Sequence, residues 1–181
     1  MMRKHKVLIS GIAVAVIAMF VVFAMTEWFA QRGAAEAKDV REDKAPDFIL
    51  KDIQGGKFSL DDQRGKPVLL IFGTTWCPSC REEIPHLKDI YARYAKKGLI
   101  IVNIDIQESR DKVSRYADKY ELPYRLLLDE NGAVAEMYGI RGVPAMILLD
   151  DAGKIVGGQR FIDPLLANLF KGKKSVVDRP A

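Results

Sequence analysis

The sequence predicts an α/β sandwich around a mixed β-sheet, preceded by one transmembrane helix. Apolar runs of strand length alternate with helical patterns from residue 67 to residue 129, and a hairpin signal stands on either side of that region. Near the N-terminus, 19 residues in succession carry no charge. With 181 residues, 49% of them hydrophobic and 29% charged, the chain has room for one globular domain and a tail.

The uncharged segment, residues 7–25, reads "VLISGIAVAVIAMFVVFAM". As an α-helix it would be about 28 Å long, which is close to the thickness of the bilayer hydrocarbon core. A cleaved signal peptide is the alternative, since it also has a basic start and an apolar run. The run is longer than the usual signal-peptide core of about 7–15 residues, so we expect an uncleaved anchor.

Basic residues precede this segment, and they favour a cytoplasmic N-terminus with the remaining chain outside the cytoplasm. They are Arg3, Lys4 and Lys6. They supply most of the net charge of +4, so the rest of the chain is close to neutral and no nucleic-acid partner is expected. The predicted divisions are a cytoplasmic tail (1–6), the anchor (7–25), a linker (26–45), the globular domain (46–172) and a C-terminal tail (173–181).

The globular domain opens with a predicted hairpin, because two short apolar pieces, 47–50 and 57–60, flank the pair Gly55–Gly56. The next strand is 67–73, where Pro67 stands at the first position and its missing N–H matters least. Residues 78–97 follow with an apolar stripe at helical spacing. Pro85 is expected to kink that helix, and Gly98 to end it.

The later elements are predicted in the same way. A buried strand at 99–106 precedes a helix that starts at Ser109, a strand at 124–129 and a short helix. Strands at 144–150 and 154–161 form a hairpin. The last helix has Asp163 as N-cap and Pro164 in its first turn. In such a sheet, chemistry belongs at the carboxyl end of a central strand, where a helix begins.

Cys77 stands at that place, and Cys80 follows three residues later; the chain has no other cysteine. At a helix N-terminus, unpaired N–H groups favour a thiolate over a thiol. We expect Cys77 to be the exposed attacking sulfur and Cys80 the partly shielded one. Cys80 would then attack the mixed disulfide and release the reduced partner.

Other roles of the cysteine pair fit less well. A disulfide inside one helical turn closes little chain and adds little stability. A closed zinc site needs four ligands, but the chain has only His5 and His86, and His5 is predicted to lie across the membrane. The alternative is a copper(I) site of Cys77, Cys80 and a methionine such as Met146. We expect a redox dithiol with no metal or separate cofactor.

Glu83 lies three residues after Cys80, on the same helical face as Ile84 and Leu87. A partly buried carboxyl at this position could accept the proton that Cys80 must lose. The alternative, a solvated helix carboxylate, fits Glu82 better.

Three segments carry a resemblance to a known family: "APDF", "SLDDQRGKPVLLIFGTTWCPSC" and "GVPAMILLDDAGKIV". They resemble the redoxin-type (AhpC/TSA) thioredoxin fold, and in particular the membrane-anchored TlpA/ResA branch of thiol–disulfide oxidoreductases. The resemblance covers about residues 45–170. It implies a thioredoxin-like three-layer sandwich with a mixed central sheet and an N-terminal β-hairpin.

The resemblance also implies site residues. In that family the proline of the Gly-x-Pro motif is cis and packs beside the redox pair, which assigns the role to Pro144. The backbone of Val143 would pair with an extended substrate segment. Trp76 and Pro78 would contribute to the docking surface, and Glu83 matches the position of a functional acid in ResA-like members.

The implied function is an extracytoplasmic reductant of protein disulfides. Apocytochrome c is the implied substrate and a membrane protein of the CcdA/DsbD type the electron donor. One alternative is a peroxiredoxin-like peroxidase, for which Thr74 fits the pattern but Leu70 stands where a proline is required. The other is a copper(I) carrier. The sequence does not set the direction of electron flow.

Overall fold

The computed structural model describes Met19, residues 44–158 and residues 162–171. The described fold lies within one unit of the chain, Asp43–Ala181. Apart from Met19, the predicted anchor at 7–25 lies outside the described residues, as do the predicted tails at 1–6 and 173–181. Within the described part of the chain, no helix has both the length and the apolar character needed to cross a membrane.

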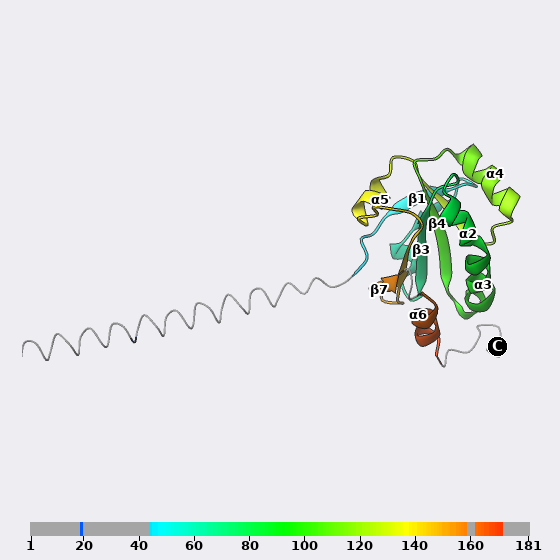
Figure 1. Ribbon diagram of the computed structural model, residues 1–181. Helices are drawn as coiled ribbons and strands as arrows, with labels where there is room; N and C mark the ends of the chain where they lie inside the picture. The colour runs from blue at the N-terminus through cyan, green and yellow to red at the C-terminus, as the bar shows by residue number, and fades with distance from the viewer. Residues whose placement is uncertain (1–18, 20–43, 159–161, 172–181) are drawn as a thin grey trace, which may run out of the picture. The chain divides into compact units, whose positions relative to one another are not determined.

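A seven-stranded mixed sheet forms the centre of the domain, in the order β2-β1-β5-β4-β3-β6-β7 (Figure 1). The pairs β3–β4 and β4–β5 are parallel, and the other four pairs are antiparallel. The strands are β1 (Ile49–Asp52), β2 (Lys57–Ser59), β3 (Val68–Gly73), β4 (Ile100–Ile106), β5 (Arg125–Asp129), β6 (Ala145–Leu149) and β7 (Ile155–Gly158).

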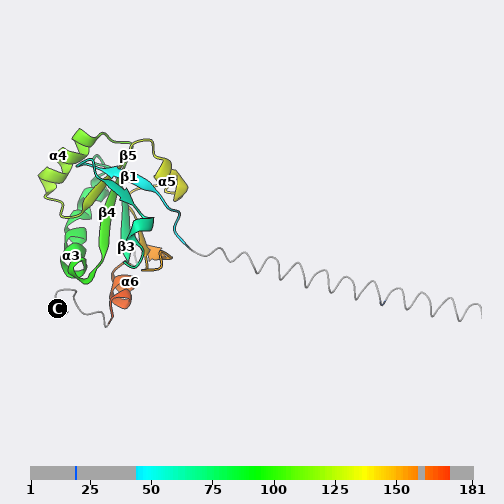
Figure 2. The same ribbon diagram turned by 180° about the vertical axis from the view of Figure 1, so that it is seen from behind.

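Helices connect these strands and cover the sheet. They are α2 (Pro78–Glu82), α3 (Ile84–Tyr94), α4 (Arg110–Tyr120), α5 (Ala133–Met137) and α6 (Ile162–Leu169), with short 3₁₀ turns η1 (Asp61–Gln63) and η2 (Ala95–Lys97). In the two opposite views of Figures 1 and 2, α3 and α4 lie toward one side of the domain and α5 toward the other.

The core has apolar clusters on both faces of the sheet, because successive side chains of a strand point to opposite faces. On one face, Leu69 and Ile71 pack with residues of α3 and α6. On the other face, Leu70 and Phe72 pack with residues of α5 and of the N-terminal hairpin. A smaller cluster packs α4 against β5. The result is the predicted three-layer arrangement around a mixed sheet.

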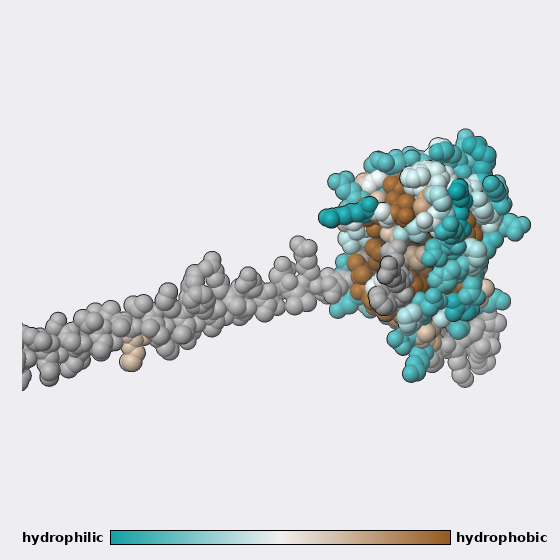
Figure 3. Space-filling view, in the orientation of Figure 1, coloured by the Kyte–Doolittle hydropathy of each residue, from teal (hydrophilic) through white to brown (hydrophobic). Residues whose placement is uncertain are grey.

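The surface follows the same division. In the view of Figure 3 the side that carries α3 and α4 is mostly hydrophilic, while hydrophobic residues gather nearer the middle of the face. On α3 the buried residues are Ile84, Leu87, Ile90 and Tyr94, all from the predicted apolar stripe.

The N-terminal hairpin of the prediction is present as β1 and β2, which pair antiparallel across the turn that contains Gly55. Gly55 has a φ of +89°, a left-handed conformation that glycine adopts without steric cost.

Two helix predictions need correction. The helix expected at 78–97 is two helices, because the chain interrupts the helix at Glu83 and Pro85 stands at the start of α3. The last helix already begins at Ile162, so Asp163 is not its N-cap. The Asp163 carboxylate instead accepts hydrogen bonds from His86 (2.8 Å) and Arg93 (3.0 Å) of α3.

Candidate active site

Cys77 lies where β3 gives way to α2, and the chain there is arranged around its sulfur. Cys77 is the N-cap of α2, and its Sγ accepts a hydrogen bond from the backbone N–H of Cys80 at 3.2 Å. Pro78 occupies the first turn, where a backbone N–H would have no partner in the helix. Because α2 has only five residues, this direct hydrogen bond, rather than a long helix dipole, supports negative charge on Cys77.

The two cysteines differ in exposure, but in the opposite sense to the prediction. Cys77 is only 6% exposed, whereas Cys80 is half-buried, so the expectation of an exposed Cys77 is wrong. The reason is tertiary: the Cys77 sulfur lies 3.7 Å from the carbonyl oxygen of Val143, on a segment 66 residues away in the sequence. Trp76, next to Cys77, is 66% exposed.

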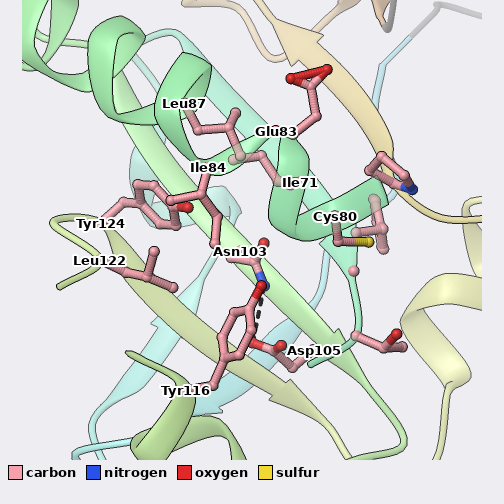
Figure 4. Close-up of a pocket in the computed structure, with 14 residues that line it drawn as sticks. Ile71, Cys80, Glu83, Ile84, Leu87, Asn103, Asp105, Tyr116, Leu122 and Tyr124 are labelled. Carbon is pink, nitrogen blue, oxygen red and sulfur yellow. Dashed lines mark hydrogen bonds between the residues drawn. The ribbon is translucent and has the colours of Figure 1, made fainter. Parts of the chain in front are cut away.

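Cys80 lines a small cavity on the inner side of α2 (Figure 4). Burial of the thiol raises its pKa to about 12, and the hydrogen bond and charge of Cys77 and the charge of Asp105 act in the same direction. A hydrogen bond with the Thr74 backbone opposes the rise. Cys80 therefore needs a proton acceptor before it can attack as a thiolate.

Asp105 lines the same cavity from β4, and it is only 1% exposed. Its carboxylate accepts a hydrogen bond from the Asn103 side-chain amide at 3.0 Å. Burial raises the pKa of Asp105 to about 7, the nearby charge of Glu108 adds to the rise, and the Asn103 hydrogen bond opposes it. Asp105 thus changes protonation near neutral pH.

Glu83 also lines this cavity, but its carboxylate is bound elsewhere. Its Oε2 lies 3.1 Å from His86 Nδ1, and His86 Nε2 lies 2.8 Å from Asp163 Oδ2. The Glu83 side chain is 36% exposed. Figure 4 shows Glu83 and Asp105 on opposite sides of Cys80, with the Glu83 carboxyl group directed away from Asp105.

Glu108 fixes the loop that leads into Cys77. Its carboxylate accepts hydrogen bonds from the backbone N–H of Thr75 and from the Thr75 hydroxyl, the latter at 2.6 Å. Lys112, one helical turn further on, lies 3.3 Å from the same carboxylate. Thr75 stands two residues before Cys77, so this buried acid anchors the loop that leads to Cys77.

The Val143–Pro144 peptide bond is cis, as the resemblance implied for Pro144. Pro144 lines the Cys80 cavity, and β6 starts at the next residue. The structure thus brings together Cys77, Cys80, Val143 and Pro144, while Trp76 and Pro78 lie exposed beside them.

The structure places Met146, the third ligand of the alternative copper site, in the apolar cluster between the sheet and α3. Neither cysteine belongs to that cluster. Among the described residues no group of three His, Cys, Asp or Glu side chains is placed to hold a metal ion.

Sequence reasoning missed Asp105, Asn103 and Glu108. A signal for the first two was available, because Ile101, Asn103 and Asp105 alternate along β4 and so share one face of the sheet. Two polar side chains on the face that packs against helices are unusual. Glu108 follows the strand in a short loop, and its sequence position carries no comparable signal.

The sequence pattern that describes the AhpC/TSA family matches residues 42–157. The chain belongs to the AhpC/TSA family. The thiol–disulfide oxidoreductase ResA of Bacillus cereus (strain ATCC 10987 / NRS 248) is 30% identical over 155 residues, which cover 86% of this chain and 88% of that protein. The chain is thus a thiol–disulfide oxidoreductase similar to ResA.

Solved structures agree with this assignment. The thioredoxin domain of a thiol–disulfide oxidoreductase from Bacteroides vulgatus matches with a TM-score of 0.64 and 29% identity, over 72% of this chain and 96% of that one. A secreted disulfide oxidoreductase of Mycobacterium tuberculosis, homologous to DsbE of Escherichia coli, matches with a TM-score of 0.55 and 28% identity, over 60% and 80%. The prediction of a thioredoxin-like α/β fold is confirmed.

Proposed function

We propose that this protein reduces disulfide bonds of other proteins outside the cytoplasm, with Cys77 as the attacking sulfur and Cys80 as the resolving sulfur. The observation that carries the proposal is the short contact between the two residues: the Cys80 N–H bonds to Cys77 Sγ at 3.2 Å, where β3 meets α2. The same N–H supports negative charge on Cys77 and brings Cys80 within reach of it.

The exchange runs in two steps. The Cys77 thiolate attacks one sulfur of the partner disulfide, a mixed disulfide forms, and the other partner sulfur leaves as a thiolate. Cys80 then loses its proton and attacks Cys77 Sγ, so the Cys77–Cys80 disulfide forms and the partner leaves with both sulfurs reduced. Two electrons pass from the dithiol to the partner, and a reductant must return them before the next cycle.

The reducing direction is proposed from the resemblance to the TlpA/ResA branch of the family. Burial raises the pKa of Cys80 to about 12, so Cys80 stays protonated until it attacks the mixed disulfide. The reduction potential depends on both sulfurs, and its measurement decides the direction of electron flow.

The partner docks, in this proposal, on Trp76, Pro78, Val143 and Pro144. Trp76 is 66% exposed and offers a large apolar contact beside the sulfur. The Val143 carbonyl lies 3.7 Å from Cys77 Sγ, so an extended peptide that pairs with this backbone would bring its own disulfide to Cys77.

Glu83 is proposed to move protons between the Cys80 cavity and solvent. It lines the cavity, yet its side chain is 36% exposed and is hydrogen-bonded to His86. A half-exposed acid at the entrance can exchange its proton with bulk water, which a buried group cannot do directly.

The proposed location is the outer face of the cell membrane, with residues 7–25 as anchor, 26–45 as linker and 46–172 as the catalytic domain. The uncharged run supports the anchor, and the Mycobacterium tuberculosis relative is described as secreted. In this location apocytochrome c would be a substrate, and a membrane protein of the CcdA/DsbD type would supply electrons.

A redox titration of the Cys77–Cys80 pair against glutathione or dithiothreitol buffers tests the reducing direction. We expect a reduction potential below that of the glutathione pool, about −220 to −260 mV. A potential well above that range would indicate an oxidase or isomerase instead. Normal levels of c-type cytochromes in a strain that lacks this protein would exclude apocytochrome c as its essential substrate.

A further inference from the structure

We propose that Asp105 accepts the proton of the Cys80 thiol when Cys80 attacks the mixed disulfide, and that Asn103 positions the Asp105 carboxylate for this step. The proposal rests on the proposed roles of Cys77 and Cys80, and it adds a proton acceptor to them. It concerns a residue on the sheet, not on the helix that carries the cysteines.

The sheet register places Asp105 on the face of the sheet that Cys80 Sγ covers. Asp105 is the direct partner of Gly73 across the parallel β3–β4 pair, so side chains at these two positions lie on the same face. Gly73 has no side chain, and Cys80 Sγ lies 3.6 Å from the point that a Cβ of Gly73 would occupy. Neighbouring strands are about 4.8 Å apart, so the sulfur sits above the gap that the Asp105 side chain borders.

Asn103 closes the other side of this gap. Its Oδ1 lies 3.7 Å from the same point above Gly73, while its Nδ2 donates to Asp105 Oδ2 at 3.0 Å. The donated hydrogen bond fixes one carboxylate oxygen and leaves the other, Oδ1, available as an acceptor.

The cavity has room for a single relay molecule. Its free volume is about 10 Å³, close to the minimum that one water needs. Thr74 Oγ1 also belongs to a cavity-lining residue, and it is a buried polar atom without a hydrogen-bond partner among the described residues. A water between Cys80 and Asp105 could also bind the Thr74 hydroxyl. One such water would pass the proton from the Cys80 thiol to the Asp105 carboxylate.

The surroundings of Asp105 suit a base that works near neutral pH. The pKa of Asp105 is raised to about 7 and that of Cys80 to about 12. The ionisable groups around Asp105 lie on several elements: Cys80 on α2, Glu83 after α2, Glu108 after β4, Tyr116 on α4 and Tyr124 before β5.

The step balances in protons and electrons. Asp105 takes the proton of Cys80, the Cys80 thiolate attacks Cys77 Sγ, and the bond between Cys77 and the partner sulfur breaks. The electron pair of the broken bond leaves with the partner as a thiolate, which takes up a proton. Asp105 then returns its proton to solvent before the next cycle.

A mixed disulfide between Cys77 and thionitrobenzoate isolates this step. When the reduced full-length chain reacts with Ellman's reagent, one thionitrobenzoate is released as Cys77 is captured and a second as Cys80 attacks. In Asp105→Asn we expect the second release to be about 100-fold slower near neutral pH, the contribution typical of a general base. Asp118→Asn, the same change on an exposed residue of α4, should leave the rate unchanged.

The pH profile separates proton transfer from a structural effect. The wild-type rate of the second release should level off above the pKa of Asp105, near pH 7, and this inflection should be absent in Asp105→Asn. Asn103→Leu removes a hydrogen bond that lowers the Asp105 pKa, so its inflection should move to higher pH. This variant and the wild-type profile remain informative even if Asp105→Asn does not fold.

Either of two results would overturn the proposal: a second release in Asp105→Asn within about threefold of wild type, or an inflection that stays in place in the Asp105 and Asn103 variants. Failure of the proposed function would look different. In that case Cys77 would not be captured in the first step, or a captured Cys77 would never release the second thionitrobenzoate in the wild type.

Discussion

Replacement of Glu108 by alanine should loosen the loop that carries Cys77, because one buried carboxylate holds that loop in place. The Glu108 side chain is only 2% exposed. It accepts hydrogen bonds from the backbone N–H and the hydroxyl of Thr75 and is paired with Lys112 at 3.3 Å. The alanine variant removes all three interactions at once.

The size of the effect follows from these contacts. Each hydrogen bond to a charged group contributes about 1.5–3 kcal/mol to the free energy of unfolding. Thr75 is half-buried, so after the substitution water can bind its freed N–H and hydroxyl groups and offset part of the lost free energy. The Lys112 side chain is 55% exposed, and its ion pair adds less than about 1 kcal/mol. We therefore expect Glu108→Ala to lower the free energy of unfolding by about 2–4 kcal/mol at neutral pH.

Urea unfolding of the purified full-length chain, followed by circular dichroism, measures this loss. The urea concentration at the unfolding midpoint should fall, while the slope of the free energy of unfolding against urea concentration stays the same. The slope is unchanged because the substitution hardly alters the surface that unfolding exposes. Lys112→Ala serves as the control, because it removes the exposed ion pair and leaves both hydrogen bonds to Thr75. If Glu108→Ala lowered the free energy of unfolding no more than Lys112→Ala does, the Glu108 carboxylate would not be the anchor of this loop.

Two further substitutions test the packing around the site. Partial burial of His86 would lower its pKa, but the hydrogen bonds with Glu83 and Asp163 outweigh burial and raise the pKa above 6.5. The contribution of His86 to the free energy of unfolding is therefore complete below pH 6.5. It is lost as the pH rises through the pKa of the folded state. His86→Ala should therefore lower the free energy of unfolding by at most about 1 kcal/mol near pH 5.5 and by less near pH 9, and an equal loss at both would contradict the ion pairs. Gly158→Ala should lower the free energy of unfolding by about 1–3 kcal/mol, since the new Cβ would lie 2.0 Å from the Met146 carbonyl oxygen. The control Gly142→Ala places its Cβ in open space and should lower the free energy of unfolding only slightly. Equal unfolding midpoints of the two variants would contradict the predicted clash.

Local patterns predicted the sheet and most helices of the domain because those patterns are physical requirements of the elements themselves. The apolar run at 67–73 became β3, the Gly55–Gly56 pair marked the hairpin, and the apolar stripe became the buried face of α3. Cys77 was correctly placed at the start of a helix for the same reason.

The features that could not be predicted depend on contacts between distant segments. Cys77 is buried because the Val143 segment covers it, and Asp163 binds His86 and Arg93 instead of capping its own helix. The direction of the Glu83 carboxylate is set in the same way, by its hydrogen bond to His86. None of these contacts leaves a periodic signal in the sequence.

Asp105 shows where a closer comparison of two strands would have helped. Alternation along β4 places Asn103 and Asp105 on one face, and Gly73 ends the neighbouring strand with no side chain. The sequence contains both facts, but the register that pairs Gly73 with Asp105 comes from the three-dimensional structure.

Capture of the mixed disulfide tests the central claim most directly. Reduced Cys80→Ser protein, mixed with a disulfide-containing peptide and digested under acidic conditions, should retain the peptide on Cys77, as read by mass spectrometry. The Cys77→Ser protein should retain none, and the wild type should yield reduced peptide and a Cys77–Cys80 disulfide. Retention of the peptide on Cys80 in the Cys77→Ser protein, with none on Cys77 in the Cys80→Ser protein, would reverse the roles assigned to the two sulfurs.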